Sequence, residues 1–297
     1  MVNEEVSTHI LVPEIALLTP LPKHIRSRFA KALHLMHQHL QHDLSWEKIA
    51  IKSAISPYHF HRQFKQLFNE PPGQYHSRVR LQHAANLLLQ SQPLSITTIA
   101  QQCGFSSSQA LAKAVKRELG VTAKTIQRMA KQATPDETSQ LLDQLAHRQK
   151  TDSFEHKLAK QMPTEIIWYD KRSYKQLQLP DNDWDHLLEQ FNDQVVDLVT
   201  LTPISQLDKP WDQIKVSVGD WRCDFNEHDN AIPEGHYLCT NVLIASSTAY
   251  LTALETLFTL AKQQGLKIDY RGQLIESVLD ANENNGVTFS FQLPILD

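Results

Sequence analysis

The sequence predicts a multidomain protein, in which an all-α domain built from a duplicated pair of helices precedes an α+β domain of two similar strand-and-helix halves. Three observations support this fold class. Charge divides sharply along the chain, helical spacings of three and four fill the basic part, and strand-like alternation fills the acidic part. A length of 297 residues also favours two domains over one.

The composition is that of a folded soluble protein, with 41% hydrophobic and 21% charged residues and only 8 glycines. It excludes disorder, collagen and coiled coil. Cys103, Cys223 and Cys239 have no CxxC spacing, so neither a disulfide framework nor a zinc knuckle is expected. The apolar stretch 10–18 is interrupted by Pro13 and Glu14, and nothing reaches the length of a spanning helix. We therefore expect a cytoplasmic protein with no membrane partner.

The formal net charge of −4 conceals a strong asymmetry. Residues 23–131 hold 16 Lys and Arg against 4 Asp and Glu, whereas residues 132–297 hold 13 basic against 26 acidic residues. A surface that was merely solvated would scatter the two signs evenly. The division predicts that the first half binds a polyanion and the second does not.

The basic segment contains a repeated helical pattern. Ile49-Ala50 followed by Ser56 returns as Ile99-Ala100 followed by Ser106. The apolar series Phe60, Phe64 and Phe68 returns, after one inserted residue, as Leu111, Val115 and Leu119. Each copy is a short helix, a turn of about four residues and a second helix, which is the spacing of a helix-turn-helix. The second turn has Gly104 where the first has Ala54, and a longer helix over 75–89 joins the copies.

Four segments follow from these patterns. We expect an N-terminal extension over 1–22, a double helix-turn-helix domain over 23–131, a linker over 132–153 and an α+β domain over 154–297. The linker is assigned because Thr134-Pro135-Asp136 should break the preceding helix. Within the last domain we expect strands over 165–169, 214–218, 236–245 and 287–293, with helices over 184–199 and 249–264.

Polar side chains face away from the apolar positions on each second helix. On the first they are Tyr58, His61, Arg62 and Lys65, and on the second they are Ser108, Gln109, Lys113 and Lys116, with the small Ala112 on the same side. The guanidinium of Arg62 suits guanine, and the amide of Gln109 suits adenine. An ordinary solvated helix face is the alternative. The duplicated spacing and the positive charge favour double-stranded DNA.

Over residues 26–130 the chain resembles the AraC/XylS-type bacterial transcription regulators. The matching positions are Ile49-Ala50, Ser56, His59-Phe60, Arg62, Phe64-Lys65, Gly73-Gln74-Tyr75, Arg80-Leu81, Ala84, Leu87-Leu88, Ile99-Ala100, Cys103-Gly104-Phe105-Ser106, Lys116-Arg117 and Gly120. The resemblance implies that both second helices enter successive major-groove segments, and that RNA polymerase is a partner. The second unit departs from the pattern at Val115 and at Thr122-Ala123, which favours phosphate contacts over base reading there.

Residues 154–297 resemble a GyrI-like effector-binding domain, chiefly at Arg271-x-Gly-Gln-x-Ile-Glu276. The resemblance implies two pseudo-symmetric halves around an aromatic-lined cleft, where Glu276 pairs with a cationic amphipathic small-molecule effector. Trp168, Trp221 and Tyr237 could then add cation-π attraction. The alternative is that Glu276 pairs with Arg271 or lies on the surface.

Catalytic and metal motifs are weak in this sequence. His34 and His37 have a spacing that a metal could use, but no cysteine or carboxylate stands nearby at ligand spacing. No Walker loop, GxSxG elbow, HExxH pair or GxGxxG turn occurs. We therefore predict no metal, no cofactor and no enzyme, but a sequence-specific DNA-binding transcription regulator with a sensing domain. Two alternatives for the acidic half are hydrolysis of reactive small molecules, with a cleft glutamate as general base, and binding of a basic protein.

Overall fold

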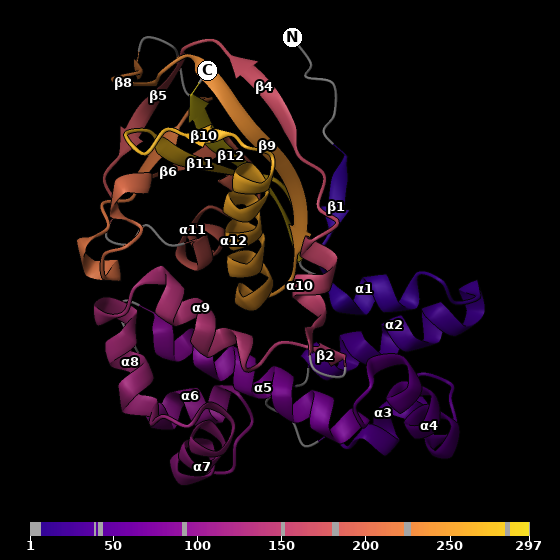
Figure 1. Cartoon of the computed structure of the whole chain (residues 1–297). Helices are drawn as coiled ribbons and strands as arrows, with labels where there is room; N and C mark the ends of the chain where they lie inside the picture. Colours follow the sequence, from indigo (N-terminus) through magenta and orange to yellow (C-terminus); the bar gives the residue numbers. More distant parts are fainter. Residues whose placement is uncertain are drawn as a thin grey trace. The chain divides into compact units, whose positions relative to one another are not determined.

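The computed structural model describes residues 7–38, 40, 44–90, 94–149, 152–179, 184–222, 227–282 and 286–296. It divides into two compact units. Val12–Lys157 forms the helical domain, and Met1–Leu11 together with Leu158–Asp297 forms the sheet domain (Figure 1). The predicted succession of a helical domain and an α+β domain is confirmed.

The helical domain is arranged around a central helix, α5. Its helices are α1 (Pro13–Leu18), α2 (Lys23–Gln38), α3 (Trp46–Lys52), α4 (Pro57–Phe68), α5 (Pro72–Leu89), α6 (Ile96–Gln102), α7 (Ser108–Leu119), α8 (Ala123–Gln132) and α9 (Pro135–Asp143). A short hairpin, β2 (Arg148–Gln149) and β3 (Asp152–Ser153), leads into α10 (Phe154–Ala159). Helix α5 buries residues from one end to the other, which lets it support both helix pairs.

The predicted linker is wrong, because its residues belong to the helical domain. Helix α9 begins where we expected a break. Thr134 accepts a hydrogen bond from the backbone N–H of Glu137, whose side chain accepts one from the N–H of Thr134, and Pro135 takes the first helical position. Leu141 and Leu142 of α9 are buried, as is Leu145 beyond it. The division between the domains falls after residue 157 instead.

The sheet domain contains ten paired strands among the described residues. The strands are β1 (Thr8–Ile10), β4 (Glu165–Tyr169), β5 (Arg172–Leu177), β6 (Leu198–Pro203), β7 (Ser217–Asp220), β8 (Asn230–Ile232), β9 (Gly235–Ile244), β10 (Lys267–Ile268), β11 (Gln273–Asn282) and β12 (Gly286–Leu296). Their order is β1-β9-β12-β11-β6-β7-β5-β8, with β10 on β12 and β4 on β9. Helices α11 (Trp184–Phe191) and α12 (Ser247–Gln263) complete the domain.

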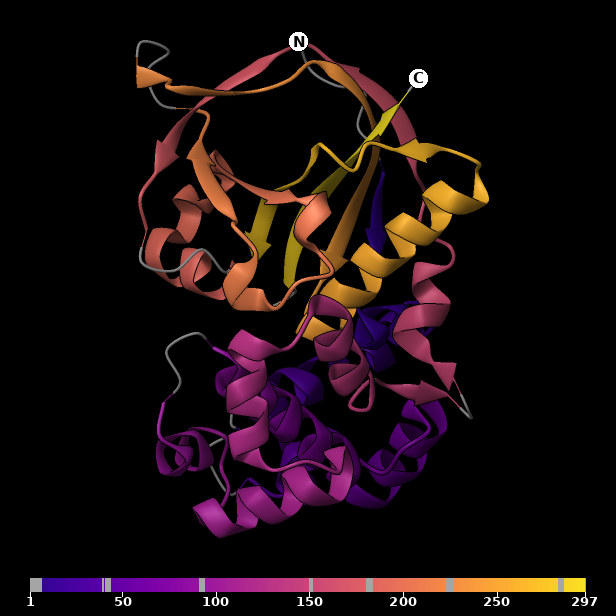
Figure 2. The same cartoon turned by 60° about the vertical axis from the view of Figure 1, so that its left-hand side comes forward.

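The sheet is strongly curled (Figure 2). Strand β4 pairs with β9 and strand β5 pairs with β7, yet only Asp170 and Lys171 separate β4 from β5. The sheet therefore curls so that β5, near one end of the strand order, comes close to β4, which pairs near the other end. A hydrogen bond of 2.8 Å from Arg172 on β5 to Gln292 on β12 spans strands that are not neighbours in the sheet.

Alternation along the strands gives the sheet two distinct faces. We call one the helix-covered face, because Leu274 and Val278 of β11 pack there with Leu187 of α11 and Leu257 of α12. We call the other the inner face. Its buried and partly buried apolar members are Ile167, Tyr169, Tyr174, Val199, Leu201, Trp221, Ile232, Tyr237, Cys239 and Ile275.

Two further predictions need correction. The expected extension 1–22 is divided between the domains, because β1 pairs in parallel with β9 while α1 packs with α4 and buries Leu18 in the helical core. We expected one helix over 184–199, but α11 ends at Phe191. The chain then forms a 3-10 turn over 192–197 and continues as β6. Leu198, Val199 and Leu201 are buried on both faces of the sheet, so their run of apolar residues does not show strand alternation. The pseudo-symmetry of the two halves stays a prediction.

Candidate nucleic-acid interface

The first helix-turn-helix unit consists of α3 and α4. The side chain of Ser56 accepts from the backbone N–H of His59, and Pro57 takes the first position of α4. Phe60, Phe64 and Phe68 are fully buried, so the opposite side of α4 faces outward. All four predicted contacts of this helix are exposed, namely Tyr58, His61, Arg62 and Lys65.

The outward side of α4 is concave. A hollow of about 600 Å³ is lined by the four predicted residues together with Trp46 and Gln66. The rings of Trp46 and His61 lie 5.3 Å apart, and the guanidinium of Arg62 lies 5.8 Å from the ring of Tyr58. We did not select Trp46 or Gln66 from the sequence. Gln66 stands four residues after Arg62, so the helical period could have indicated it.

The second unit consists of α6 and α7. Here Ser107, the residue after Ser106, which repeats Ser56 in the sequence pattern, accepts from the backbone N–H of Ala110 and caps α7. Gln109, Ala112, Lys113 and Lys116 are exposed, and Ser108 is half-buried. The Nζ of Lys116 donates to the carbonyl of Gly120 at 2.6 Å, so this side chain also closes the end of its helix.

The two turns share one backbone conformation. Ala54 has φ of 56° and Gly104 has φ of 68°, so both lie in the left-handed region. Gly104 is required by its surroundings as well, because an added Cβ would lie 1.8 Å from the carbonyl oxygen of Leu40. Arg80 of α5 braces the same turn by donating to the carbonyl of Cys103 at 2.7 Å, and its guanidinium lies 4.8 Å from the ring of Phe105.

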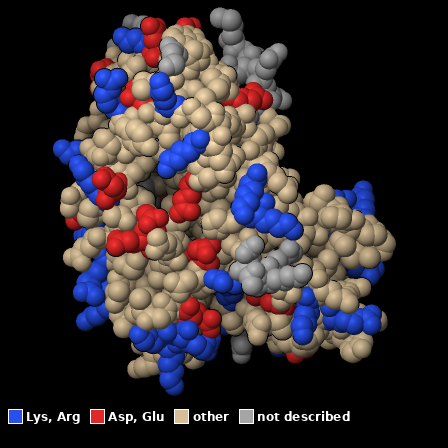
Figure 3. Space-filling view, in the orientation of Figure 1, with Lys and Arg blue, Asp and Glu red and all other residues tan. Residues whose placement is uncertain are grey.

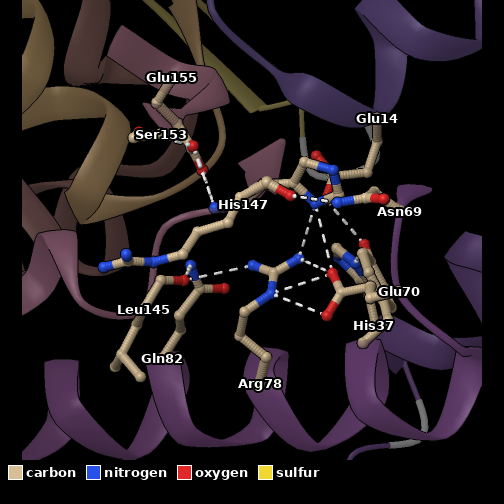
Figure 4. Close-up of polar contacts among 12 residues, drawn as sticks. Glu14, His37, Asn69, Glu70, Arg78, Gln82, Leu145, His147, Ser153 and Glu155 are labelled. Atoms are coloured by element: carbon tan, nitrogen blue, oxygen red, sulfur yellow. Dashed lines mark hydrogen bonds and ion pairs between the residues drawn. The ribbon is translucent and has the colours of Figure 1, made fainter. Parts of the chain in front are cut away.

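A buried polar cluster joins the first unit to the segment that follows α9 (Figure 4). Arg78 of α5 donates to Glu70 at 2.6 Å and to the carbonyl of Leu145 at 3.3 Å, and His147 lies 3.3 Å from Glu70. Burial alone would raise the pKa of Glu70, but its bonds to His147 and Arg78 lower it. The backbone N–H of His147 donates to the carboxylate of Glu155, whose pKa is raised by burial.

Positive charge follows these helices. The helical domain holds 19 Lys and Arg against 10 Asp and Glu, whereas the remaining residues hold 10 against 23. In Figure 3, Lys and Arg side chains gather over α4 and over α7. The field of the helical domain therefore attracts a polyanion.

Glu276 is buried on the helix-covered face and is only 3% exposed. It accepts hydrogen bonds from the indole N–H of Trp184 on α11, at 2.9 Å, and from the hydroxyl of Tyr250 on α12. Burial raises the pKa of Glu276, although these two bonds lower it in part. The expected alternative of a pair with Arg271 is wrong, because that side chain is 88% exposed and lies beside Asp269.

The other predicted effector residues do not surround Glu276. Tyr237 and Trp221 pack on the inner face, whereas Glu276 lies on the helix-covered face. Trp168 is half exposed on β4, with its ring edge against His236. The prediction of one shared pocket is therefore wrong for Tyr237 and Trp221, because the alternation of strand residues separates them from Glu276. The partners of Glu276, Trp184 and Tyr250, were not predicted from the sequence.

One of the two histidines with the spacing of a metal site, His37, makes a different contact. His37 bonds to the hydroxyl of Tyr75 at 2.8 Å, and burial lowers its pKa. In the part of the chain that the structure describes, no three His, Cys, Asp or Glu side chains are grouped so that they could hold a metal ion. The described helices also include none that is long and apolar enough to cross a bilayer.

Two capped second helices with outward basic faces, joined by a rigid α5, define a double helix-turn-helix domain of the class that binds duplex DNA. Residues 49–129 match the helix-turn-helix domain family. The HTH-type transcriptional activator RhaS of Escherichia coli O139:H28 is 33% identical over 100 residues, which are 34% of this chain and 36% of RhaS. This part of the chain is thus similar to AraC-type helix-turn-helix DNA-binding domains, and the chain spans about a third of the length of the curated relatives that it matches.

Two solved structures are similar to this part of the chain. One is a transcriptional regulator with an AraC-type DNA-binding domain from Chromobacterium violaceum, at 27% identity and a TM-score of 0.34, which covers 37% of this chain and 96% of that one. The other is the DNA-binding domain of AdpA in complex with a target DNA, at 27% identity and a TM-score of 0.32, which covers 33% and 88% respectively.

Proposed function

We propose that this protein is a sequence-specific, DNA-binding transcription regulator and not an enzyme. The observation that carries the proposal is the repeated placement of polar and basic side chains on the outward faces of α4 and α7, opposite their buried apolar faces. Similarity to a transcriptional activator supports RNA polymerase as a partner.

Each outward face has a distinct chemistry for this task. The planar guanidinium of Arg62 can donate two hydrogen bonds to the O6 and N7 atoms of guanine, and the amide of Gln109 can bond the N6 and N7 atoms of adenine. Lys65 and Lys113 are exposed ammonium groups that can contact phosphates and release counterions. Base reading by the first unit and phosphate contacts by both units would fix the protein on one face of the duplex.

Selection of bound fragments from a random DNA library by the full chain tests this function. We expect one enriched motif, and we expect Arg62→Ala to relax the preference at one base pair. Arg271→Ala is the matched control, since that arginine is exposed in the sheet domain and lies outside α4 and α7. Absence of any enriched motif would refute sequence-specific binding.

We further propose that the sheet domain senses a hydrophobic cation at Glu276. The supporting observation is a buried carboxyl group whose two described partners, Trp184 and Tyr250, are both neutral donors to the same oxygen. Aromatic rings of Phe289 and Phe291 pack against Tyr250. A buried carboxylate without a counter-charge is costly, so a ligand that supplied one would bind preferentially in its charged form.

Phenyltrimethylammonium and its neutral isostere tert-butylbenzene test this second proposal. The full chain should bind the cation more tightly, and Glu276→Gln should abolish the difference, because the amide keeps the shape but not the charge. Calorimetric titration measures both affinities. An unchanged preference for the cation in the variant would contradict a role of Glu276.

The pH dependence of stability gives a second readout. Because burial raises its pKa, folded Glu276 keeps its proton at pH values where the unfolded chain, with an ordinary value of 4.5, has lost it. The free energy of unfolding should therefore fall as pH rises above about 4.5 through the folded pKa. Glu276→Gln should flatten this fall and leave the Tm at neutral pH unchanged or higher, as chemical and thermal unfolding at several pH values would show.

A further inference from the structure

Arg172 occupies an unusual place on the inner face of the sheet. Its guanidinium lies 4.1 Å from the ring centre of Tyr169 and 5.3 Å from that of Tyr237. One nitrogen, Nη1, donates to the side-chain oxygen of Gln292 at 2.8 Å. Gln292 is itself 5% exposed. The arginine is thus held in a fixed orientation by two rings and one amide.

The other two nitrogens of this guanidinium, Nε and Nη2, are buried and have no well-aligned hydrogen-bond partner within the described residues, although the hydroxyl of Tyr237 lies close to the guanidinium. They form one edge of the planar group, with two parallel N–H bonds at the spacing of the two oxygens of a carboxylate. The bond to Gln292 uses the third nitrogen and leaves this edge open. A buried group with two unsatisfied donors is uncommon in folded proteins and calls for an explanation.

The surroundings of Arg172 do not balance its charge. In the described part of the chain, no Asp or Glu lies within ion-pair distance of its guanidinium. Burial raises the pKa values of Tyr169 and Cys239 to about 12, and that of Tyr237 is also raised, so these neighbours stay neutral near pH 7. Burial lowers the pKa of Arg172, yet an arginine remains charged at neutral pH.

We propose that Arg172 is the anchor of an anion site on the inner face, which binds the carboxylate of a small organic acid with an aromatic or other apolar body. The open edge of the guanidinium would take both carboxylate oxygens. Tyr169 and Trp221 are partly buried and Tyr237 is buried, and they supply apolar walls for the body of the ligand.

A carboxylate fits this site better than a phosphate. One guanidinium balances a single negative charge, and the described side chains nearest to it, Tyr169, Tyr237 and Gln292, are neutral. The walls are aromatic and aliphatic, so a ligand needs an apolar body to replace the water that it displaces. This site differs from that proposed at Glu276 in face, in sign of charge and in ligand, and it does not depend on the proposed DNA-binding function.

Titration of the full chain with benzoate and with its neutral isostere benzamide tests the proposal. We expect benzoate to bind at least about tenfold more tightly than benzamide, because only benzoate satisfies the open edge with a charged acceptor. Arg172→Met should weaken benzoate at least about tenfold, since the thioether keeps the apolar stem but donates no hydrogen bond. Arg271→Met is the matched control, because that arginine is exposed and outside the inner face, and it should leave the benzoate affinity unchanged.

A conservative variant keeps the test valid if Arg172→Met fails to fold. Arg172→Lys keeps the positive charge but lacks the planar two-nitrogen edge, so benzoate affinity should still fall several-fold. Nitrogen-detected NMR adds a local readout. The Nε–H signal of Arg172 is assigned as the one that is absent from the spectrum of Arg172→Lys. In the parent chain this signal should shift when benzoate is added.

Two results would overturn the proposal. One is the absence of benzoate binding to the parent chain at about 10 mM, a concentration at which even a Kd of about 1 mM would be detected. The other is an equal benzoate affinity in the parent, Arg172→Met and Arg172→Lys chains. Either result would assign Arg172 to a purely structural role, in which stacking on Tyr169 and Tyr237 holds the curled sheet together.

Discussion

In the first helix-turn-helix unit three phenylalanines of α4 fill the core, whereas the corresponding positions of α7 hold Leu111, Val115 and Leu119. All six side chains are almost fully buried, and each of the two helix pairs has a left-handed residue in its turn, Ala54 in the first and Gly104 in the second. The geometry therefore depends on apolar residues at spacings of four, and not on their identity or volume.

The two units differ in the polar contacts that hold each of them to the rest of the helical domain. Around the first, Glu70 lies in the cluster with Arg78 and His147, so the chain beyond α9 is fastened to it. Around the second, Arg80 of α5 holds the turn at Cys103 and Phe105. The two units thus share one backbone arrangement but have different supporting contacts.

The largest effect that separates the units should come from Phe64→Ala. Removal of this ring should lower the free energy of unfolding by about 4 kcal/mol, because it contacts Phe29, Phe60, Phe68 and Tyr75. The matched change Val115→Ala removes less buried volume and should cost about 2 kcal/mol. Chemical denaturation measures both free energies of unfolding. Equal losses of free energy in the two variants would contradict the idea that the removed side-chain volume determines the difference.

Arg78→Met should have the next largest effect, about 3 kcal/mol, because it leaves Glu70 buried without its charged partner. Hydrogen exchange should become faster in α4 and in residues 145–149, while α7 keeps its protection. Arg80→Met is the matched control, with faster exchange expected at the second turn instead. If either variant made hydrogen exchange equally faster in both units, the two units would not be stabilised independently of each other.

The sequence predicted the features of this domain that arise from local spacing. The two helix-turn-helix pairs and the exposed face of α4 depend on residues that are close in the chain, and the structure places both as expected. The expected break at Thr134-Pro135 does end α8 at Gln132, but α9 begins there at once and packs into the helical domain, because threonine before proline also starts helices.

Long-range pairing could not be predicted in the same way. Glu276 was selected correctly as a buried carboxyl group of the sheet domain, but its partner Trp184 lies 92 residues away in the sequence. The face on which Tyr237 lies depends on the register between β9 and its neighbours, which a single sequence does not specify. Arg172 was not selected at all, because its lack of an acidic partner is visible only after folding.

DNA recognition should differ between the units by a smaller amount. Arg62→Ala should cost about 2 kcal/mol of binding free energy at the preferred sequence and relax the base preference at one base pair. Lys113→Ala should weaken binding to all sequences alike and reduce the slope of log K against log salt concentration by about 1. Binding isotherms at several salt concentrations, on specific and random duplexes, measure both effects. Equal loss on both duplexes for Arg62→Ala would assign that residue to phosphate contacts.

The smallest predicted effect concerns the two turns. Ala54→Gly should raise the free energy of unfolding by up to about 1 kcal/mol, because alanine is strained at a φ of 56°. Gly104→Ala should have the opposite sign, because its Cβ would collide with the carbonyl oxygen of Leu40. Thermal unfolding of both variants measures the difference, and destabilisation by Ala54→Gly would show that its methyl group makes a compensating contact.

Strand β1 has a consequence for the order of events during synthesis. Its partner residues on β9, Asn241–Leu243, leave the ribosome roughly 230 residues after β1 itself, whereas the helical domain is complete at residue 157. At ordinary translation speeds this delay lasts on the order of 10 to 50 seconds. A newly made chain therefore holds an unpaired strand at a time when its helical domain is already complete, and the proposed contacts with DNA could form before the sheet domain exists.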